Sequence, residues 1–228
     1  MAANRGTGAA ATRASTEIIV LAGVNGAGKS SVAGAYLRAH AADYFNPDEA
    51  AREFRQANPG ADQKAANAVA WDLGKRGLER VIREGGTFAF ETTLGGKTIT
   101  SLLLRAAQAG ARVHIWYAGL ESVALHLKRV RGRVATGGHD IPEADIRRRW
   151  EQSHLNLIRL IPHVTTLRVY DNSTEADPHK GKAPAPRLVL EFAEKTLTFP
   201  PREQLAATPA WAKPIVLAAY KHFGLIQA

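Results

Sequence analysis

The chain has 228 residues, of which 45% are hydrophobic, so it is long enough to bury the core of one globular domain. It contains no cysteine, which excludes disulfides and thiolate metal sites, and no segment approaches the roughly 18 apolar residues of a membrane-spanning helix. The formal net charge of +9 fits either a nucleic acid or an anionic small substrate as partner, and we expect a soluble, cytoplasmic protein.

The hydrophobic pattern alternates between strands and helices. Residues 1–15 lack periodicity and are predicted to be a disordered leader. The apolar run 17–24 predicts a strand buried on both faces, and a helix should follow from 29 to about 40. Further strands are predicted at 44–45, 87–91, 112–120 and 166–173, and further helices from Asn46 as N-cap and at 62–84, 97–110, 123–134 and 142–161. This order predicts an α/β fold with a parallel sheet and helices on both faces.

The pattern changes near residue 175. A loop is predicted at 173–186, followed by runs at 187–192 and 196–199 that flank a short turn. These two runs predict a β-hairpin outside the main sheet, and 211–222 predicts a terminal helix. We therefore expect a core at 16–175 and a loop, hairpin and helix at 176–228 that pack on it.

The stretch GVNGAGKSS, residues 23–31, directly follows the first predicted strand. It matches G-x-x-x-x-G-K-[ST] at every fixed position, and the strand before it and helix after it supply the required setting. Glycines let backbone N–H groups turn toward phosphates, Lys29 reaches the β and γ oxygens, and the Ser30 hydroxyl can ligate Mg²⁺. The residues predicted to hold the nucleotide are Gly23, Asn25, Gly26, Ala27, Gly28, Lys29, Ser30 and Ser31.

The remainder of the chain narrows the class of P-loop protein. It has no LSGGQ-like signature of an ABC-type ATPase and no N-K-x-D motif of a switch GTPase. A phosphotransferase is the leading class that remains. Such an enzyme needs a carboxylate that orients the acceptor, an acid near the metal and cations around the migrating phosphoryl group.

Polar residues follow the predicted strands at the edge where ligands bind in an open parallel sheet. Asp48 is predicted to be a general base or acceptor anchor, although a first-turn acid also favours the helix dipole. Glu91 is predicted to hold Mg²⁺, its water or the acceptor, unless it only caps the strand. Thr92 and Thr93 are predicted acceptor contacts.

Other polar residues carry weaker signals. Asp171 and Asn172 follow the last core strand, and they either lie against the adenine or form an Asx turn. His126, His154 and His163 have no metal-ligand spacing and are predicted to be surface or helix-end residues.

A basic run marks the two helices on either side of the Gly-rich break ATGGHD. Its members are Lys128, Arg129, Arg131, Arg133, Arg147, Arg148 and Arg149. Such a run is usually a solvated helix face, but helices flanking a flexible break also suit a lid, here at about 125–150, that closes over phosphates. We predict that at least one of Arg131, Arg133, Arg147 and Arg148 contacts phosphate, with His139 as a weaker candidate.

Four stretches together resemble the zeta toxin family, P-loop kinases of bacterial toxin–antitoxin systems: GVNGAGKSS, YFNPDEAAREF, FETTLGGK and RVRGRVATGGHDIPEADIRRRWEQS. The resemblance covers about residues 17–173. It implies a nucleoside-monophosphate-kinase-like core, ATP with Mg²⁺, and transfer of the γ-phosphate to the 3′-hydroxyl of the amino sugar in UDP-N-acetylglucosamine. It also implies an antitoxin protein as a possible partner.

Site residues are carried over position by position. Asp48 matches the family's catalytic carboxylate, and Glu91 and Thr93 match the acid and threonine of its E-G-T segment, with Thr92 in place of the Gly. The first lid arginine corresponds to Arg131 or Arg133, whereas the second has no clear equivalent. The residues that the resemblance makes catalytic are Lys29, Asp48, Arg131 and Arg133.

Two other classes stay open. The basic charge is compatible with a nucleic-acid end kinase or RNA-processing protein, although no basic stripe interleaved with aromatic residues is present. A regulatory ATPase would hydrolyse ATP without an acceptor. The stretches that bind the UDP-sugar in zeta toxins are not recognisable in this sequence.

Overall fold

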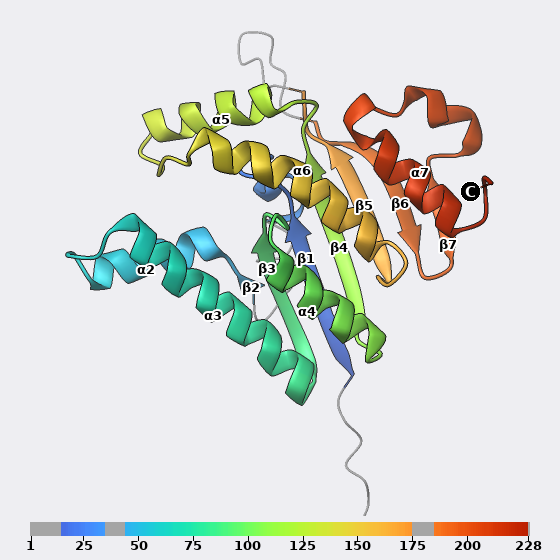
Figure 1. Cartoon of the computed structure of the whole chain (residues 1–228). Coiled ribbons are helices and arrows are strands. Elements are labelled where there is room, and N and C mark those ends of the chain that lie inside the picture. The colour runs from blue at the N-terminus through green and yellow to red at the C-terminus, as the bar shows by residue number, and fades with distance from the viewer. Residues whose placement is uncertain (1–14, 35–43, 175–184, 228) are drawn as a thin grey trace, which may run out of the picture.

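The computed structural model describes residues 15–34, 44–174 and 185–227, and within them seven strands form one sheet (Figure 1). The strands are β1 (Thr16–Ala22), β2 (Tyr44–Phe45), β3 (Gly86–Thr92), β4 (Arg112–Gly119), β5 (Thr166–Asp171), β6 (Arg187–Ala193) and β7 (Thr196–Phe199). Their order is β2-β3-β1-β4-β5-β6-β7; the first five pair in parallel and the last two are antiparallel. The predicted P-loop kinase-like α/β fold is confirmed.

The helices follow the predicted order. They are α2 (Pro47–Ala57), α3 (Gln63–Glu84), α4 (Lys97–Gln108), α5 (Val123–Ala135), α6 (Glu143–Leu160) and α7 (Lys213–His222), with short turns η1 (Ser30–Gly34), η3 (Arg202–Ala207) and η4 (Ala210–Ala212). The helix predicted at 29–40 lies within the described residues only as far as 34. Residues 1–14 and 175–184, which include most of the predicted leader and loop, lie outside the described residues. Within the described part of the chain, no helix is both long and apolar enough to cross a membrane.

Alternation along β1 builds the core on both faces of the sheet. Ile18 and Val20 are fully buried in one cluster with apolar side chains of α3, α4, α6 and α7, and Figure 1 shows α4 and α6 lying in front of the strands. Leu21 faces the opposite side and packs with Ala33 of η1. Burial of each such large aliphatic side chain contributes about 1.5–3 kcal/mol. This packing holds the carboxyl end of β1, and with it the loop that follows, in place.

The start of α2 is set by its cap. Asn46 has extended backbone, and its Oδ1 accepts a hydrogen bond from the backbone N–H of Asp48 at 2.9 Å, while Pro47 occupies the first helical position. Both choices satisfy the backbone requirements of a helix start, and such a cap is worth about 1 kcal/mol. The cap confirms the predicted helix start and places Asp48 in the first turn, beside the end of β2.

The C-terminal hairpin extends the main sheet, so the prediction that it lies outside is wrong. β6 pairs antiparallel with β5, and Arg168 of β5 pairs with Glu191 of β6 at 2.6 Å. Leu190 and Phe192 are buried in the same cluster as the strands of the core. The hairpin thereby covers the edge that β5 would otherwise expose. A hairpin pattern indicates two strands and a turn, but it does not indicate which strand it will pair with.

Candidate active site

The P-loop has the conformation that its glycines allow. Gly23 has φ +146°, and a Cβ there would lie 2.4 Å from the backbone oxygen of Ala118. Gly28 has φ +74°, and a Cβ there would lie 2.3 Å from Nδ2 of Asn172. Both positions combine positive φ with a close approach, so a side chain is excluded at each. The backbone N–H of Gly23 donates to the carbonyl of Thr92 at 3.1 Å, which ties the loop to the end of β3.

Two buried polar side chains form hydrogen bonds to backbone carbonyls of the P-loop. Nδ2 of Asn172 donates to the carbonyl of Ala27 at 2.8 Å, and Nδ1 of His126 lies 2.8 Å from the carbonyl of Asn25. Because a carbonyl only accepts, Nδ1 of His126 carries the proton. Asn172 and His126 are 2% and 1% exposed, so neither bond competes with solvent. Asn172 directly follows β5 and His126 lies in α5, 145 and 101 positions further along the chain than the carbonyls they bind.

Of the three histidines predicted to be surface or helix-end residues, His126 lies in the first turn of α5 but is buried, and His154 is not on the surface either. Burial lowers the pKa of His126 to about 4, outweighing its hydrogen bond to Asn25, which raises it. His154 is partly buried between two tryptophan rings, and burial lowers its pKa to about 4 as well. The prediction was wrong because absence of metal-ligand spacing says nothing about which helix face packs inward. His163 is exposed, as predicted.

Lys29 and Glu91 face each other where the P-loop meets β3. Nζ of Lys29 donates to the carbonyl of Gly23 at 3.2 Å and lies 3.8 Å from Oε2 of Glu91. The other carboxylate oxygen of Glu91 accepts from the Tyr44 hydroxyl and, at 3.2 Å, from Nδ2 of Asn46. Glu91 is only 9% exposed. Its carboxylate is therefore held in one position and directed at the P-loop lysine.

The oxygen donors here suit Mg²⁺ rather than a softer ion. Glu91 supplies a carboxylate, and Ser30 supplies a hydroxyl in the exposed first turn after the loop. Within the described residues, no group of three or more His, Cys, Asp or Glu side chains forms a metal site by itself. Mg²⁺ commonly takes one or two protein oxygens and completes its shell with water and substrate phosphates. The residues present fit that kind of site.

The segment after β3 forms a tight turn. The Thr92 hydroxyl oxygen accepts from the N–H of Leu94 at 3.0 Å, and that of Thr93 accepts from the N–H of Gly95 at 3.4 Å. Leu94 has φ +53°, which an L side chain rarely adopts, and it is buried. Each threonine keeps its hydroxyl proton for a ligand, since accepting a bond does not use it.

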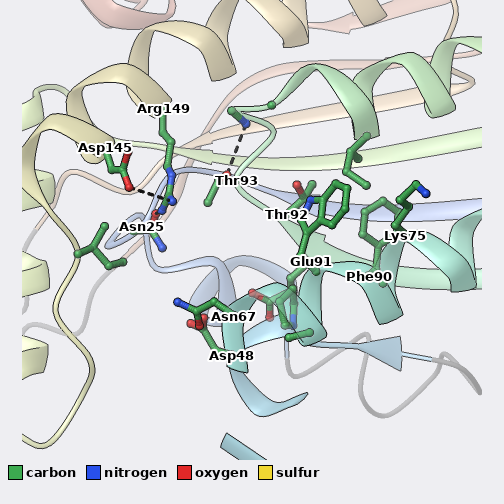
Figure 2. A pocket seen from close by; sticks show the side chains of 18 of the residues that line it. Asn25, Asp48, Asn67, Lys75, Phe90, Glu91, Thr92, Thr93, Asp145 and Arg149 are labelled. Atoms are coloured by element: carbon green, nitrogen blue, oxygen red, sulfur yellow. Dashed lines mark hydrogen bonds and ion pairs between the residues drawn. The ribbon is translucent and has the colours of Figure 1, made fainter. Parts of the chain in front are cut away.

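A cavity of about 470 Å³ lies beyond the end of β3 (Figure 2). Four residues predicted at the strand ends line it together: Asp48, Glu91, Thr92 and Thr93. The wall formed by α3 was not predicted, and it contributes Asn67, Trp71 and Lys75. These three stand at intervals of four residues, which places them on one helix face. That spacing is the signal in the sequence that could have identified them.

Of the two predicted lid arginines on α6, Arg148 lines the cavity and Arg147 does not. Arg147 pairs with Glu143 at 2.6 Å and is 59% exposed, and Arg148 lines the cavity but pairs with Asp145 at 2.9 Å and is 57% exposed. Arg131 of α5 is 74% exposed, and its nearest carboxylate is Glu143 at 3.7 Å. In this structure Arg131 and Arg147 are solvated residues on the outer surface of these helices.

Arg149 is the α6 arginine that reaches the P-loop. Its Nη1 donates to Oδ1 of Asn25 at 2.8 Å, and Figure 2 shows the two side chains meeting at one wall of the cavity. Its Nη2 lies 3.5 Å from Asp145. Burial lowers the pKa of Arg149, although Asp145 opposes the shift. The sequence interpretation counted Arg149 only in the basic run, yet it stands three residues after the fully buried Ile146, and that spacing points toward the core.

Arg133 reaches Asp48 from α5. Its Nη1 lies 3.6 Å from Oδ2 of Asp48, and the Asp48 side chain is 57% exposed. Nε and Nη2 of Arg133 are shielded from solvent and have no hydrogen-bond partner among the described residues. His139 follows in the next loop and lines the same cavity as Asp48. Arg133 therefore places a positive charge next to the predicted base.

At the end of β5, the structure shows the Asx turn rather than an open side chain. Oδ1 of Asp171 accepts from the backbone N–H of Ser173 at 3.1 Å and from the Ser173 hydroxyl. Asn172 holds the P-loop, and its backbone carbonyl accepts from Arg129 at 2.8 Å. Contact of Asp171 or Asn172 with the adenine stays a prediction.

Comparisons with known proteins bear on the family and the fold of this chain. A family model described as AAA domain, AAA_33, matches residues 18–153. Over 136 residues the chain is 30% identical to an uncharacterized protein of Haemophilus influenzae, an alignment that covers 58% of this chain and 91% of that protein.

The fold is also similar to that of a chain in the AvrRxo1-ORF1:AvrRxo1-ORF2 complex solved with sulphate ions. The TM-score is 0.62 at 15% identity, over 86% of this chain and 65% of that one. The complex solved with ATP gives the same values. The chain thus spans just under two thirds of that structural neighbour's length.

Proposed function

The chain belongs to the AAA domain family, and from that premise we propose that it is a kinase that transfers the γ-phosphate of ATP to a hydroxyl group of a small acceptor. The observation that carries the proposal is the cavity of about 470 Å³ that begins at the P-loop and holds Asp48, Glu91, Thr92 and Thr93. Hydrolysis of ATP needs room beside the γ-phosphate only for a water molecule. The volume of this cavity is instead in the range of small-molecule sites, about 300–1,000 Å³.

Several features support ATP with Mg²⁺ as the phosphate donor. The positive φ values of Gly26 and Gly28 give the turned backbone that a phosphate-binding loop needs, and Lys29 beside the loop is the residue that would contact β and γ oxygens. Ser30 and Glu91 are the residues that would hold Mg²⁺, which when bound offsets negative charge on the phosphates. A chain of similar fold was solved with ATP.

In the proposed reaction, an acceptor oxygen forms a bond to the γ-phosphorus while the bond to the β,γ-bridging oxygen breaks, and ADP leaves. Asp48 takes the proton of the acceptor hydroxyl, while Thr92 and Thr93 orient the acceptor. Lys29 and Arg149 stabilise charge on the migrating phosphoryl group from the P-loop side, and Arg133 of α5 contributes positive charge beside Asp48. We propose that α5 and α6 act as the lid, since Arg149 already spans from α6 to the loop.

The resemblance to zeta toxins supports a finer proposal: the acceptor is a UDP-amino-sugar such as UDP-N-acetylglucosamine, and an antitoxin protein binds the kinase. Asp48, Glu91 and Thr93 stand together as the resemblance requires. Thr92, where those toxins have Gly, adds a side chain to the wall of the cavity.

The test is a mass-spectrometric survey of the purified protein with ATP and Mg²⁺ against UDP-sugars, nucleotides, small alcohols and short RNAs. We expect one acceptor to gain the mass of one phosphate with the wild type and with Lys195→Ala, a control in the exposed hairpin turn. Lys29→Ala should remove the product, because the lysine contacts the transferring group.

The other outcomes are equally definite. Free phosphate as the sole product would replace the kinase with a regulatory ATPase. Phosphate on RNA alone would replace the small acceptor with a nucleic-acid end. A UDP-sugar that stays unmodified while another alcohol gains phosphate would contradict only the finer proposal.

A further inference from the structure

A second cavity, of about 610 Å³, opens between α2 and the loop that joins α5 to α6. We call it the arginine groove, and its walls are Asp48, Arg52, Arg55, Gln56 and Gln63 on one side and Arg133, Gly137, Gly138 and His139 on the other. Asp48 and His139 also line the first cavity. The two cavities therefore meet at the residue that we propose as the base.

The charges of α2 are divided between two faces. Arg52 and Arg55 line the groove with Asp48, whereas the other carboxylates of the helix, Glu49 and Glu53, do not. Asp48 stands four positions before Arg52, a spacing that permits an ion pair, but the ion pair that Asp48 makes is with Arg133 at 3.6 Å. The groove thus contains three arginine side chains against one carboxylate, which gives it a positive field.

The guanidinium groups are only partly neutralised. Nη1 of Arg55 donates to the neutral Gln63 amide oxygen at 3.0 Å, which positions the side chain without cancelling its charge. Arg52 has no hydrogen-bond or ion-pair partner among the described residues. Arg133 contacts Asp48 at 3.6 Å, while its Nε and Nη2, shielded from solvent, remain unpaired within the described chain. Arginine charges that are only partly neutralised around a hollow attract an anion to it.

We propose that the arginine groove binds a phosphate group carried by the small acceptor, while the acceptor's reacting hydroxyl lies in the first cavity. This inference rests on the proposed kinase function and names the class of its acceptor: an alcohol that already bears phosphate. Phosphate offers several oxygens to the planar fork of Arg, which matches such groups with paired hydrogen bonds. Asp48 stands where the two parts of that acceptor would join.

Occupancy of the groove also bears on the base. Asp48 and an incoming phosphate compete for the same Arg133 guanidinium, which lies 3.6 Å from the carboxylate. A phosphate that takes over the Arg133 donors leaves Asp48 free to accept the hydroxyl proton. The acceptor's own phosphate would then help to prepare the site for transfer.

The test measures binding, not turnover. Isothermal titration calorimetry is run with saturating non-hydrolysable ATP analogue and Mg²⁺, so that the P-loop is filled. The probes are matched pairs, uridine against uridine diphosphate and glucose against glucose 6-phosphate, with a short single-stranded RNA as a third arm. We expect at least one phosphorylated member to bind more tightly than its partner compound.

Variants assign that preference to the groove. Arg52→Ala and Arg55→Ala should each weaken the phosphorylated probe by about tenfold, the effect of a lost charged hydrogen bond, and leave the unphosphorylated probe unchanged. Arg76→Ala is the matched control, because Arg76 is an exposed helical arginine, 72% exposed, that lines neither cavity. All three substitutions are at the surface, so each should change stability little. Melting temperatures equal to that of the wild type would show that each variant is folded.

Each result decides the inference. Equal affinity within every pair, or a preference that survives Arg52→Ala and Arg55→Ala, would overturn it. Binding of RNA alone, lost in both variants, would overturn the small acceptor as the source of the phosphate. A protein that binds as expected but transfers no phosphate would contradict the kinase proposal and leave the groove standing, whereas transfer without dependence on Arg52 and Arg55 would do the reverse.

Discussion

The P-loop side and the acceptor side of this site are built differently. The loop is held by buried hydrogen bonds to its backbone from Asn172 and His126, both nearly inaccessible to solvent. On the acceptor side Asp48 is 57% exposed, and Trp71 of α3 is 48% exposed. Backbone geometry is thus set on the phosphate-donor side before any ligand arrives, while the acceptor side presents open side chains. Substitutions should therefore cost stability on the first side and rate on the second.

Arg149 connects the two sides. It lines the acceptor cavity, yet its hydrogen bond goes to the P-loop residue Asn25, whose own carbonyl contacts His126. A change here should lower the rate of the proposed transfer by altering how α6 meets the loop. The difference between the two sides can be tested by substitutions of Asp48 on the proposed acceptor side, of Arg149 at the connection, and of His126 beneath the P-loop.

The largest effect is expected from Asp48→Asn. Loss of the general base should lower the transfer rate by about 10² to 10⁴, with ATP affinity unchanged. Stability should change little, because exposed ion pairs such as Asp48 with Arg133 contribute about 1 kcal/mol or less. Single-turnover kinetics, nucleotide titration and urea unfolding measure the three quantities. Transfer at the wild-type rate with nucleotide bound would remove Asp48 from its role.

Arg149→Ala should have the next largest effect, because it removes a cation that is hydrogen-bonded to the P-loop. We expect the rate of the chemical step to fall by about 10², as when one preorganised donor is lost from a site of developing charge. Arg131→Ala is the control: Arg131 is 74% exposed, so its loss should change the rate less than about twofold. Equal losses of rate in the two variants would contradict this expectation and support the sequence prediction that Arg131 contacts phosphate.

The smallest effect is on stability in mild acid. The folded-state pKa of His126 is about 4, below its ordinary 6.5, so the unfolded chain binds the proton first as pH falls. The contribution is fully present above about pH 6.5 and decreases toward pH 4, which predicts a loss of about 2 kcal/mol in the free energy of unfolding between about pH 7 and pH 5. His154, with a pKa of about 4, adds a similar loss.

Urea unfolding at the two pH values separates these histidines from other groups. His126→Gln should reduce the pH dependence by roughly half, while His163→Gln, at an exposed position, should leave it as in the wild type. Identical pH dependence in the two variants would mean that His126 is not buried in its neutral form under the P-loop.

Much of this protein is determined by local sequence. The strands and helices follow the periodicity of apolar residues, Asn46 and Pro47 specify the start of α2, and the glycines at 23 and 28 specify a loop that other residues cannot form. The rule that ligands bind at the carboxyl ends of parallel strands then brings Asp48 and Glu91 to one cavity. These features depend on residues that are neighbours in the chain or on the end of a strand at the sheet edge, and both can be recognised from the amino-acid sequence.

Tertiary structure alone decided the rest. Three adjacent arginines on α6 differ by about 100° each around the helix axis, so only the packing of that helix could choose Arg149 over Arg147 and Arg148. Likewise, the pairing of β6 with β5 and the position of His126 under the loop join segments that are distant in the chain. Such contacts form because the whole core is packed together. The local sequence pattern indicates that a segment is buried, but it does not indicate which distant segment will pack against it.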